Sequence, residues 1–221
     1  MQIAIDGPAG AGKSTISKFV ASEMGFLYID TGAMYRAIGY KVLKNNISLD
    51  EKEKIDELAK NSEIEIKITD QGQGIFLDGK DVTDKIRTPE VSMAASTVSA
   101  IGGVRKTLVQ LQRKIAGSNN VIMDGRDIGT VVLPDAEIKI FLTATAEDRA
   151  MRRYLELKEK GLDVNYQEVL DDMQKRDYQD THRAESPLRA AEDATVIDTS
   201  GQTLGESVQL IVDFIKSRVE A

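Results

Sequence analysis

The stretch "GPAGAGKST" at residues 7–15 constrains the fold of this chain more than any other. It follows the apolar run "QIAID" and precedes "STISKFVASEMG", where apolar residues recur at helical spacing up to Gly25. The full pattern G-x-x-x-x-G-K-[ST] between a strand and a helix is the context in which this motif binds phosphate. Its backbone N–H groups can surround a pyrophosphate, and the helix N-terminus adds partial positive charge. The alternative is a glycine-rich turn that only starts a helix.

Three residues, two in this loop and one far along the chain, indicate phosphate and metal chemistry. We expect Lys13 to reach the β and γ phosphates of a nucleotide and Ser14 to ligate Mg²⁺. Asp124 ends the apolar run "NNVIMD", as does the acidic residue that holds Mg²⁺ through water in such folds. An aspartate after a strand is more often a turn former or a cap, so both readings of Asp124 stay open.

The rest of the chain predicts an α/β fold. The runs "FLYID", "NNVIMD", "AEIKIFLTA" and "ATVID" resemble the first strand and alternate with helical or polar stretches, which indicates a five-stranded parallel sheet flanked by helices. Residues 62–87 instead alternate apolar and polar residues around glycines and the Asp78-Gly79 turn. This pattern is typical of antiparallel hairpins, so we expect one domain over residues 1–221 with an inserted subdomain at about 60–95.

Composition limits the functional classes. The net charge of −7 argues against a broad nucleic-acid surface, because phosphate-backbone binding is mainly electrostatic. There is no cysteine, no leader pattern before Gly7, and no apolar run near the ~18 residues that span a bilayer. We therefore expect a soluble cytoplasmic protein that binds neither a nucleic-acid polymer nor a membrane.

Arginine is concentrated between two predicted late strands. A helix capped by Thr145, with Asp148 three residues later, should run to Gly161, and another should span about Tyr166 to His182. The first helix carries three arginines on one face that repel each other unless anions neutralise them, and the second carries two arginines around one aspartate; they are Arg149, Arg152, Arg153, Arg176, Asp180 and Arg183. A solvated charged face and a surface salt-bridge ladder are the plain alternatives.

Arg36 and Arg126 are expected at the carboxyl edge of the sheet, where ligands bind in open α/β folds. Together with the phosphate-binding loop, these arginines suggest two phosphorylated substrates. No N-K-x-D motif is present, and the only D-x-x-G, at residues 198–201, lies too late for a regulatory GTPase. A kinase for a small acceptor is the better reading, and a nonenzymatic nucleotide-binding module is a further alternative.

The motifs "IDGPAGAGKST", "DTGAMYR", "DGRDIGTVVLPDA" and "KIFL", with the "RD…HR" segment, resemble bacterial cytidylate kinases, which are P-loop nucleoside monophosphate kinases, from end to end. The resemblance implies transfer of the γ-phosphoryl group of ATP to CMP or dCMP with Mg²⁺. Another nucleoside monophosphate such as UMP is the alternative acceptor. The resemblance also implies a mobile arginine-rich lid over about residues 149–186. We expect the protein to be a monomer.

Residue roles follow from the same resemblance. The donor ATP would be bound by Gly7, Pro8, Ala9, Gly10, Ala11, Gly12, Lys13, Ser14, Thr15, Arg152 and Arg153. The acceptor would be bound by Thr31, Tyr35, Arg36, Ser96, Arg105, Arg126, Asp127, Arg176, Asp180 and Arg183. The catalytic groups would be Lys13, Arg126, Arg176 and Arg183, with Ser14 and Asp124 at the metal. Asp127 is the candidate that accepts a hydrogen bond from the cytosine amine.

Overall fold

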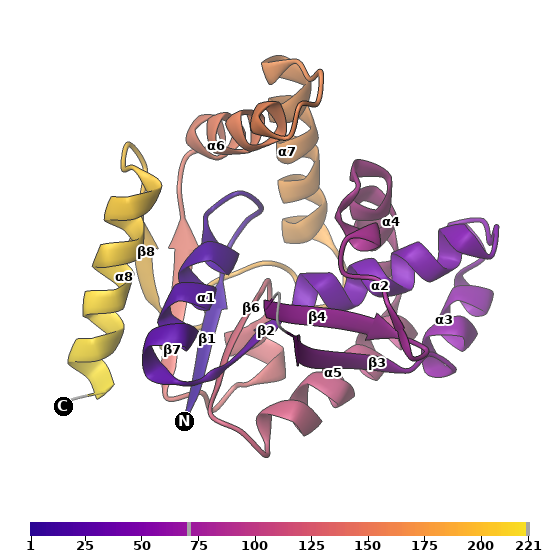
Figure 1. The fold of residues 1–221 in the computed structure, drawn as a ribbon, viewed down its shortest axis with the longest axis horizontal. Helices are drawn as coiled ribbons and strands as arrows, with labels where there is room; N and C mark the ends of the chain where they lie inside the picture. Colours follow the sequence, from indigo (N-terminus) through magenta and orange to yellow (C-terminus); the bar gives the residue numbers. More distant parts are fainter. Residues whose placement is uncertain (70–71, 220–221) are drawn as a thin grey trace. The chain divides into compact units, whose positions relative to one another are not determined.

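The computed structural model describes residues 1–69 and 72–219, and the chain divides into two compact units (Figure 1). The first unit joins Met1–Tyr28 to Asn119–Ala221, and the second is Ile29–Ser118.

A five-stranded sheet forms the centre of the first unit. Its strands are β1 (Gln2–Asp6), β2 (Leu27–Asp30), β6 (Val121–Gly125), β7 (Ile138–Thr143) and β8 (Thr195–Asp198), in the order β2-β6-β1-β7-β8. β1 pairs in parallel with both neighbours, Gln2 opposite Val121 and Ile3 opposite Ile138. The predicted five-stranded parallel sheet is confirmed. Because the strands are parallel, the segments that follow β1 and β6 leave the sheet at the same edge.

The helices of this unit are α1 (Lys13–Met24), α6 (Ala146–Glu159), α7 (Tyr166–His182) and α8 (Leu204–Val219), with a short π-helix η2 (Ile128–Val132). The main core contains fully buried side chains from β1, α1, β7 and α8, among them Ile5, Ile16, Leu142 and Ile211. A second, smaller core joins the phosphate-binding loop to α6 and α7 through Ala9, Ala150, Leu170 and Met173. The apolar spacing read from the sequence thus packs the helices on the sheet.

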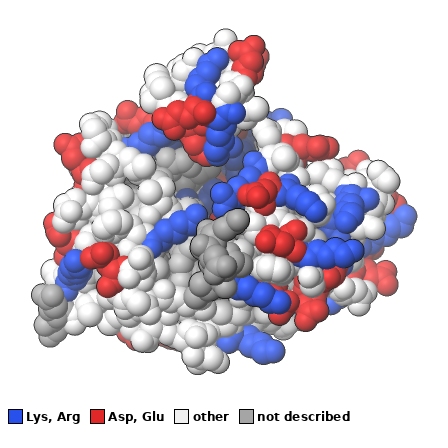
Figure 2. All heavy atoms as spheres, in the orientation of Figure 1, with Lys and Arg blue, Asp and Glu red and all other residues white. Residues whose placement is uncertain are grey.

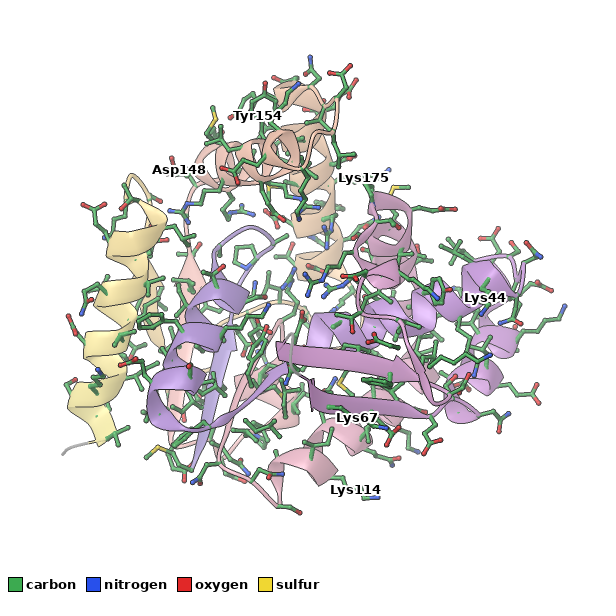
Figure 3. The ribbon with its side chains drawn as sticks, in the orientation of Figure 1. Lys44, Lys67, Lys114, Asp148, Tyr154 and Lys175 are labelled. Carbon is green, nitrogen blue, oxygen red and sulfur yellow. The ribbon has the colours of Figure 1, made fainter. Side chains whose placement is uncertain are left out.

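Local sequence signals set the helix ends. Gly25 adopts φ 65° after α1, the left-handed conformation that ends many helices. The Thr145 hydroxyl accepts a hydrogen bond from the backbone N–H of Asp148 at 3.2 Å, which confirms the predicted cap of α6. Figure 3 labels Asp148 in this first turn. α6 ends at Glu159, two residues before the predicted Gly161, whereas α7 has the predicted bounds.

The second unit combines helices with a small antiparallel sheet. Its elements are α2 (Thr31–Lys44), α3 (Lys52–Lys60), β3 (Ile64–Thr69), β4 (Gly72–Leu77), β5 (Lys80–Asp81), the 3-10 helix η1 (Lys85–Arg87), α4 (Pro89–Ser99) and α5 (Gly102–Ala116). The sheet order is β3-β4-β5. Asp78 and Gly79, at φ 49° and 74°, turn the chain between β4 and β5, as the sequence predicts. Residues 70–71 of the predicted hairpins lie outside the described residues.

Charge is mixed on the surface that Figure 2 draws, where Lys and Arg side chains alternate with Asp and Glu. Within residues 1–69 and 72–219, no helix is both long enough and apolar enough to span a bilayer.

Candidate active site

The loop between β1 and α1 has the backbone that the glycine pattern predicts. Gly7 has φ 149°, and a Cβ atom built on it would lie 1.9 Å from the carbonyl oxygen of Leu142. Only glycine fits this close approach of two backbones. Gly12 has φ 88° and precedes Lys13, the first residue of α1. The loop therefore ends at a helix N-terminus, where backbone N–H groups without intrahelical partners can bind an anion.

Lys13 is buried in this loop, with 7% of its surface exposed, and its Nζ donates a hydrogen bond to the carbonyl of Pro8 at 2.7 Å. Burial, and next the positive charge of Arg126, lower the pKa of Lys13 to about 7, against the opposite effect of Asp124 and Asp6. An anion beside the buried Lys13 would stabilise the charged form of its ammonium group. The phosphates of a nucleotide would supply that negative charge.

Ser14 and Asp124 lie together. The Ser14 hydroxyl donates to a carboxylate oxygen of Asp124 at 2.6 Å, and the Tyr28 hydroxyl lies 3.3 Å from the other oxygen. Ser14 is exposed, whereas Asp124 is buried. A hydroxyl and a carboxylate are hard oxygen ligands that suit Mg²⁺. No cluster of three or more His, Cys, Asp or Glu side chains suited to a metal occurs among the described residues, so phosphate oxygens would have to complete the coordination of an ion here.

Asp6, the last residue of β1, clamps the segment after β6. Its carboxylate accepts hydrogen bonds from the backbone N–H groups of Ile128 at 2.8 Å and Gly129 at 2.7 Å. Burial raises the pKa of Asp6 to about 6, although these two hydrogen bonds lower it. Asp6, the residue before the phosphate-binding loop, is thereby hydrogen-bonded to the two residues directly after Asp127. Sequence reasoning did not single out this residue.

A cluster of two arginines and two aspartates lies beyond β6. Arg126 Nε donates to Asp180 at 2.8 Å, while guanidinium nitrogens of Arg183 lie 3.7 Å from Asp127 and 3.9 Å from Asp180. Burial opposes the charge of both partners of the first pair, but Asp180 raises the pKa of Arg126 and Arg126 lowers the pKa of Asp180. Arg176 is a further cation acting on Asp180. The Arg126–Asp180 pair therefore stays charged, and the cluster can orient guanidinium groups toward a phosphate.

The three arginines of α6 do not share one environment. Arg149 is buried and contacts other parts of the first unit, Arg152 donates to the carbonyls of Thr199 and Gln202, and Arg153 pairs with Glu156 at 2.8 Å. The repulsion expected along this face is thus relieved by protein groups in this structure. The proposed contacts of Arg152 and Arg153 with ATP stay predictions.

In the second unit, the predicted acceptor-binding residues lie on α2, α4 and α5. Arg105 is buried, donates to the carbonyl of Ser99 at 3.1 Å, and lies over the ring of Tyr35 at 5.7 Å. Arg36 pairs with Asp30 at 2.8 Å. Thr31 is buried in the first turn of α2, and Ser96 is half-buried on α4. Arg105 and Tyr35 are therefore brought together, whereas Arg36 has its own carboxylate partner.

Comparisons with known proteins identify the family of this chain. The profile of the family "Cytidylate kinase" matches residues 3–217. A protein named cytidylate kinase from Caldicellulosiruptor bescii is 60% identical over 96% of this chain and 94% of its own length. Another of that name, from Caldanaerobacter subterraneus subsp. tengcongensis, is 54% identical over 100% of this chain and 96% of its own. An uncharacterized protein from Eubacterium ventriosum shares the fold, with a TM-score of 0.52 at 17% identity, over 98% of this chain and 99% of its own. The chain belongs to the cytidylate kinase family.

Proposed function

We propose that this protein transfers the γ-phosphoryl group of ATP to CMP and dCMP, forming CDP and dCDP. The observation that carries the proposal is the position of the Arg126–Asp180–Arg183–Asp127 cluster. Arg126 and Asp127 follow β6 at the same sheet edge as the phosphate-binding loop after β1, and there they pair with Asp180 and Arg183 at the end of α7. Family membership supports the same activity.

The residues of the first unit divide between donor and acceptor. Backbone N–H groups of residues 7–15 would bind the ATP phosphates, and Lys13 would neutralise charge that develops on the transferred group. Arg126, Arg176 and Arg183 would hold the acceptor phosphate in line. That phosphate has a second pKa near ~6 and is largely anionic at neutral pH, so positioning matters more than a general base.

Magnesium fits the pair formed by Ser14 and Asp124, because both offer oxygen atoms and lie 2.6 Å apart. The Ser14 hydroxyl would contact the ion, and Asp124 would hold it directly or through water. When bound, Mg²⁺ neutralises phosphate charge and orients the terminal phosphates.

Cytosine would be selected by groups that match its edge. Cytosine offers an N4 amine beside the N3 and O2 acceptors, so a carboxylate for the amine and an arginine or hydroxyl for the acceptors discriminate it from uracil. Asp127 is proposed for the amine, and Ser96 and Arg105 for the acceptors. UMP is the alternative substrate if this selection fails.

A coupled assay with ATP and each of CMP, dCMP, UMP and AMP tests the proposal. We expect CMP and dCMP to be preferred, and a preference for UMP or AMP over both would refute it. The variant Asp127→Asn should lower the ratio of kcat/KM for CMP to that for UMP by about tenfold or more, because a charged acceptor for the amine is lost. An unchanged ratio would remove Asp127 from base recognition.

Other expectations remain predictions. They are the lid over residues 149–186, the nucleotide-monophosphate-binding subdomain at about 60–95, the monomeric state and the cytoplasmic location. Closure of the arginine-rich lid on nucleotide binding would keep water from the transferred phosphoryl group.

A further inference from the structure

The guanidinium group of Arg149 makes more hydrogen bonds to the protein than an arginine on a solvated helix face would need. It lies in the first two turns of α6 and is 5% exposed. Its Nε donates to the carbonyl of Ala144 and one terminal nitrogen donates to the carbonyl of Ala9, both at 2.9 Å. The other terminal nitrogen donates to the carboxylate of Asp177 at 2.6 Å. One guanidinium group thus joins the end of β7, the phosphate-binding loop and α7.

The Ala9 carbonyl belongs to the tip of the phosphate-binding loop. Next to it, Gly10 has φ 74°, and a Cβ atom built there would lie 2.3 Å from the Met173 side chain and 3.1 Å from Cβ of Arg149. Ala9 itself is buried against Ala150 and Met173. The loop tip is therefore packed on α6 and α7, and Arg149 provides its charged anchor.

One stripe of α7 faces these groups. Leu170, Met173, Asp177 and Asp180 follow one another at spacings of three or four residues, so they share a side of the helix. The apolar half of the stripe packs in the core that contains Ala9, and the acidic half pairs with arginines. Asp177 forms an ion pair with Arg149. One turn later, Asp180 forms ion pairs with Arg126 and Arg183. α7 consequently contacts both the donor loop and the proposed acceptor cluster.

Asp177 is partly buried and interacts with more than one arginine, unlike the carboxylate of a surface ion pair. One of its carboxylate oxygens is buried and has no hydrogen-bond partner among the described residues, while the other receives Arg149. Its charge acts on Arg126 as well. A carboxylate so placed depends on neighbouring guanidinium groups for its compensation. Loss of Arg149 would leave this charge less neutralised and would free the carbonyl of Ala9.

We propose that Arg149, held by Asp177, is a positioning residue for the ATP site. It fixes the tip of the phosphate-binding loop through the Ala9 carbonyl so that the loop N–H groups point at the donor phosphates before ATP arrives. The inference rests on the proposed use of this loop for ATP. It assigns Arg149 no contact with either substrate.

Kinetics of Arg149→Met, Arg149→Lys and Asp177→Asn test the proposal, with Arg218→Lys on α8 as the matched control. We expect KM for ATP to rise about tenfold or more in the three site variants, with KM for CMP within about twofold of wild type. Lysine should not rescue, because a single ammonium group cannot reach three partners as a planar fork does. Arg149→Met combined with Asp177→Asn should be no worse than the poorer single variant, because each single variant already removes the Arg149–Asp177 pair.

ATP binding measured by calorimetry without any acceptor separates this inference from the proposed function. A wild-type protein that binds ATP but does not phosphorylate CMP would refute the function and leave the inference testable by ATP affinity alone. Circular dichroism and thermal unfolding identify a variant that fails to fold. If Arg149→Met does not fold, ATP affinity of Asp177→Asn decides. Unchanged ATP affinity in Asp177→Asn, full recovery in Arg149→Lys, or equal losses for ATP and CMP would overturn the proposal.

Discussion

Replacing Asp6 by asparagine removes an ionisable group from the buried end of β1 while keeping its size. Asp6 is 4% exposed and accepts two backbone hydrogen bonds, and burial raises its pKa from 3.8 to about 6. Between these two pH values the folded state binds more protons than the unfolded state. The stability that protonated Asp6 contributes is therefore complete below pH 3.8 and is lost as the pH rises through 6.

The size of this effect follows from the shift. Each pKa unit corresponds to 1.36 kcal/mol, so the full change amounts to about 3 kcal/mol. Between pH 4.5 and pH 7.5, linkage gives a loss of about 2 kcal/mol from this one group. Asparagine has one acceptor oxygen in place of two, so the N–H of Ile128 or Gly129 loses its partner at a cost of roughly 1–3 kcal/mol. That cost does not depend on pH and leaves the slope unchanged.

Urea unfolding of wild type and Asp6→Asn at pH 4.5, 5.5, 6.5 and 7.5 measures the difference directly. We expect the wild type to lose about 2 kcal/mol relative to the variant over this range, with somewhat more than half of the loss between pH 4.5 and pH 5.5. The exposed substitution Asp135→Asn is the control for general charge effects. A difference between wild type and Asp6→Asn that stays constant within about 0.5 kcal/mol would refute the reasoning.

Further predictions concern the loop and the arginine cluster. Because the pKa of Lys13 is lowered to about 7, ATP binding should take up a proton at pH 8 and not at pH 6; calorimetry in two buffers of different ionisation enthalpy measures it, and Lys13→Arg should abolish it. Gly7→Ala should abolish ATP binding or folding, since its Cβ would lie 1.9 Å from a backbone oxygen. A Cβ atom added at Gly25 would meet nothing within 4 Å, so the variant Gly25→Ala should bind ATP normally. It should lose about 1 kcal/mol of stability. Arg183→Met should lower kcat/KM for CMP by roughly 10- to 100-fold, and Arg218→Met should not; equal values for both variants would exclude Arg183 from the acceptor site.

Much of the fold could be predicted because its signals are local. β-branched runs mark the strands, the Thr145 hydroxyl caps α6, and the Asp78-Gly79 pair turns the chain between β4 and β5. The phosphate-binding loop is likewise contained in nine residues. Ser14 can pair with Asp124 because the loop after β1 and the end of β6 lie at the same edge of the parallel sheet.

The rest depends on contacts between distant residues. Asp6 and Ile128 are 122 positions apart, and Arg149 and Ala9 are 140 apart, so no spacing rule connects them. An arginine on an apparently charged helix face gives no sign that it is buried. The end of α6 at Glu159 shows the ordinary uncertainty of a boundary whose glycine lies beyond the last turn.

The central place of β1 in the sheet has a consequence for biosynthesis. β1 leaves the ribosome before both of its neighbours in the sheet, β6 and β7, which lie more than a hundred residues downstream. At ~5–20 residues per second the N-terminal strand waits unpaired for several seconds, with the nucleotide loop attached to it. The nascent chain would thus acquire its capacity to bind ATP only after residue 143, the end of β7, has emerged.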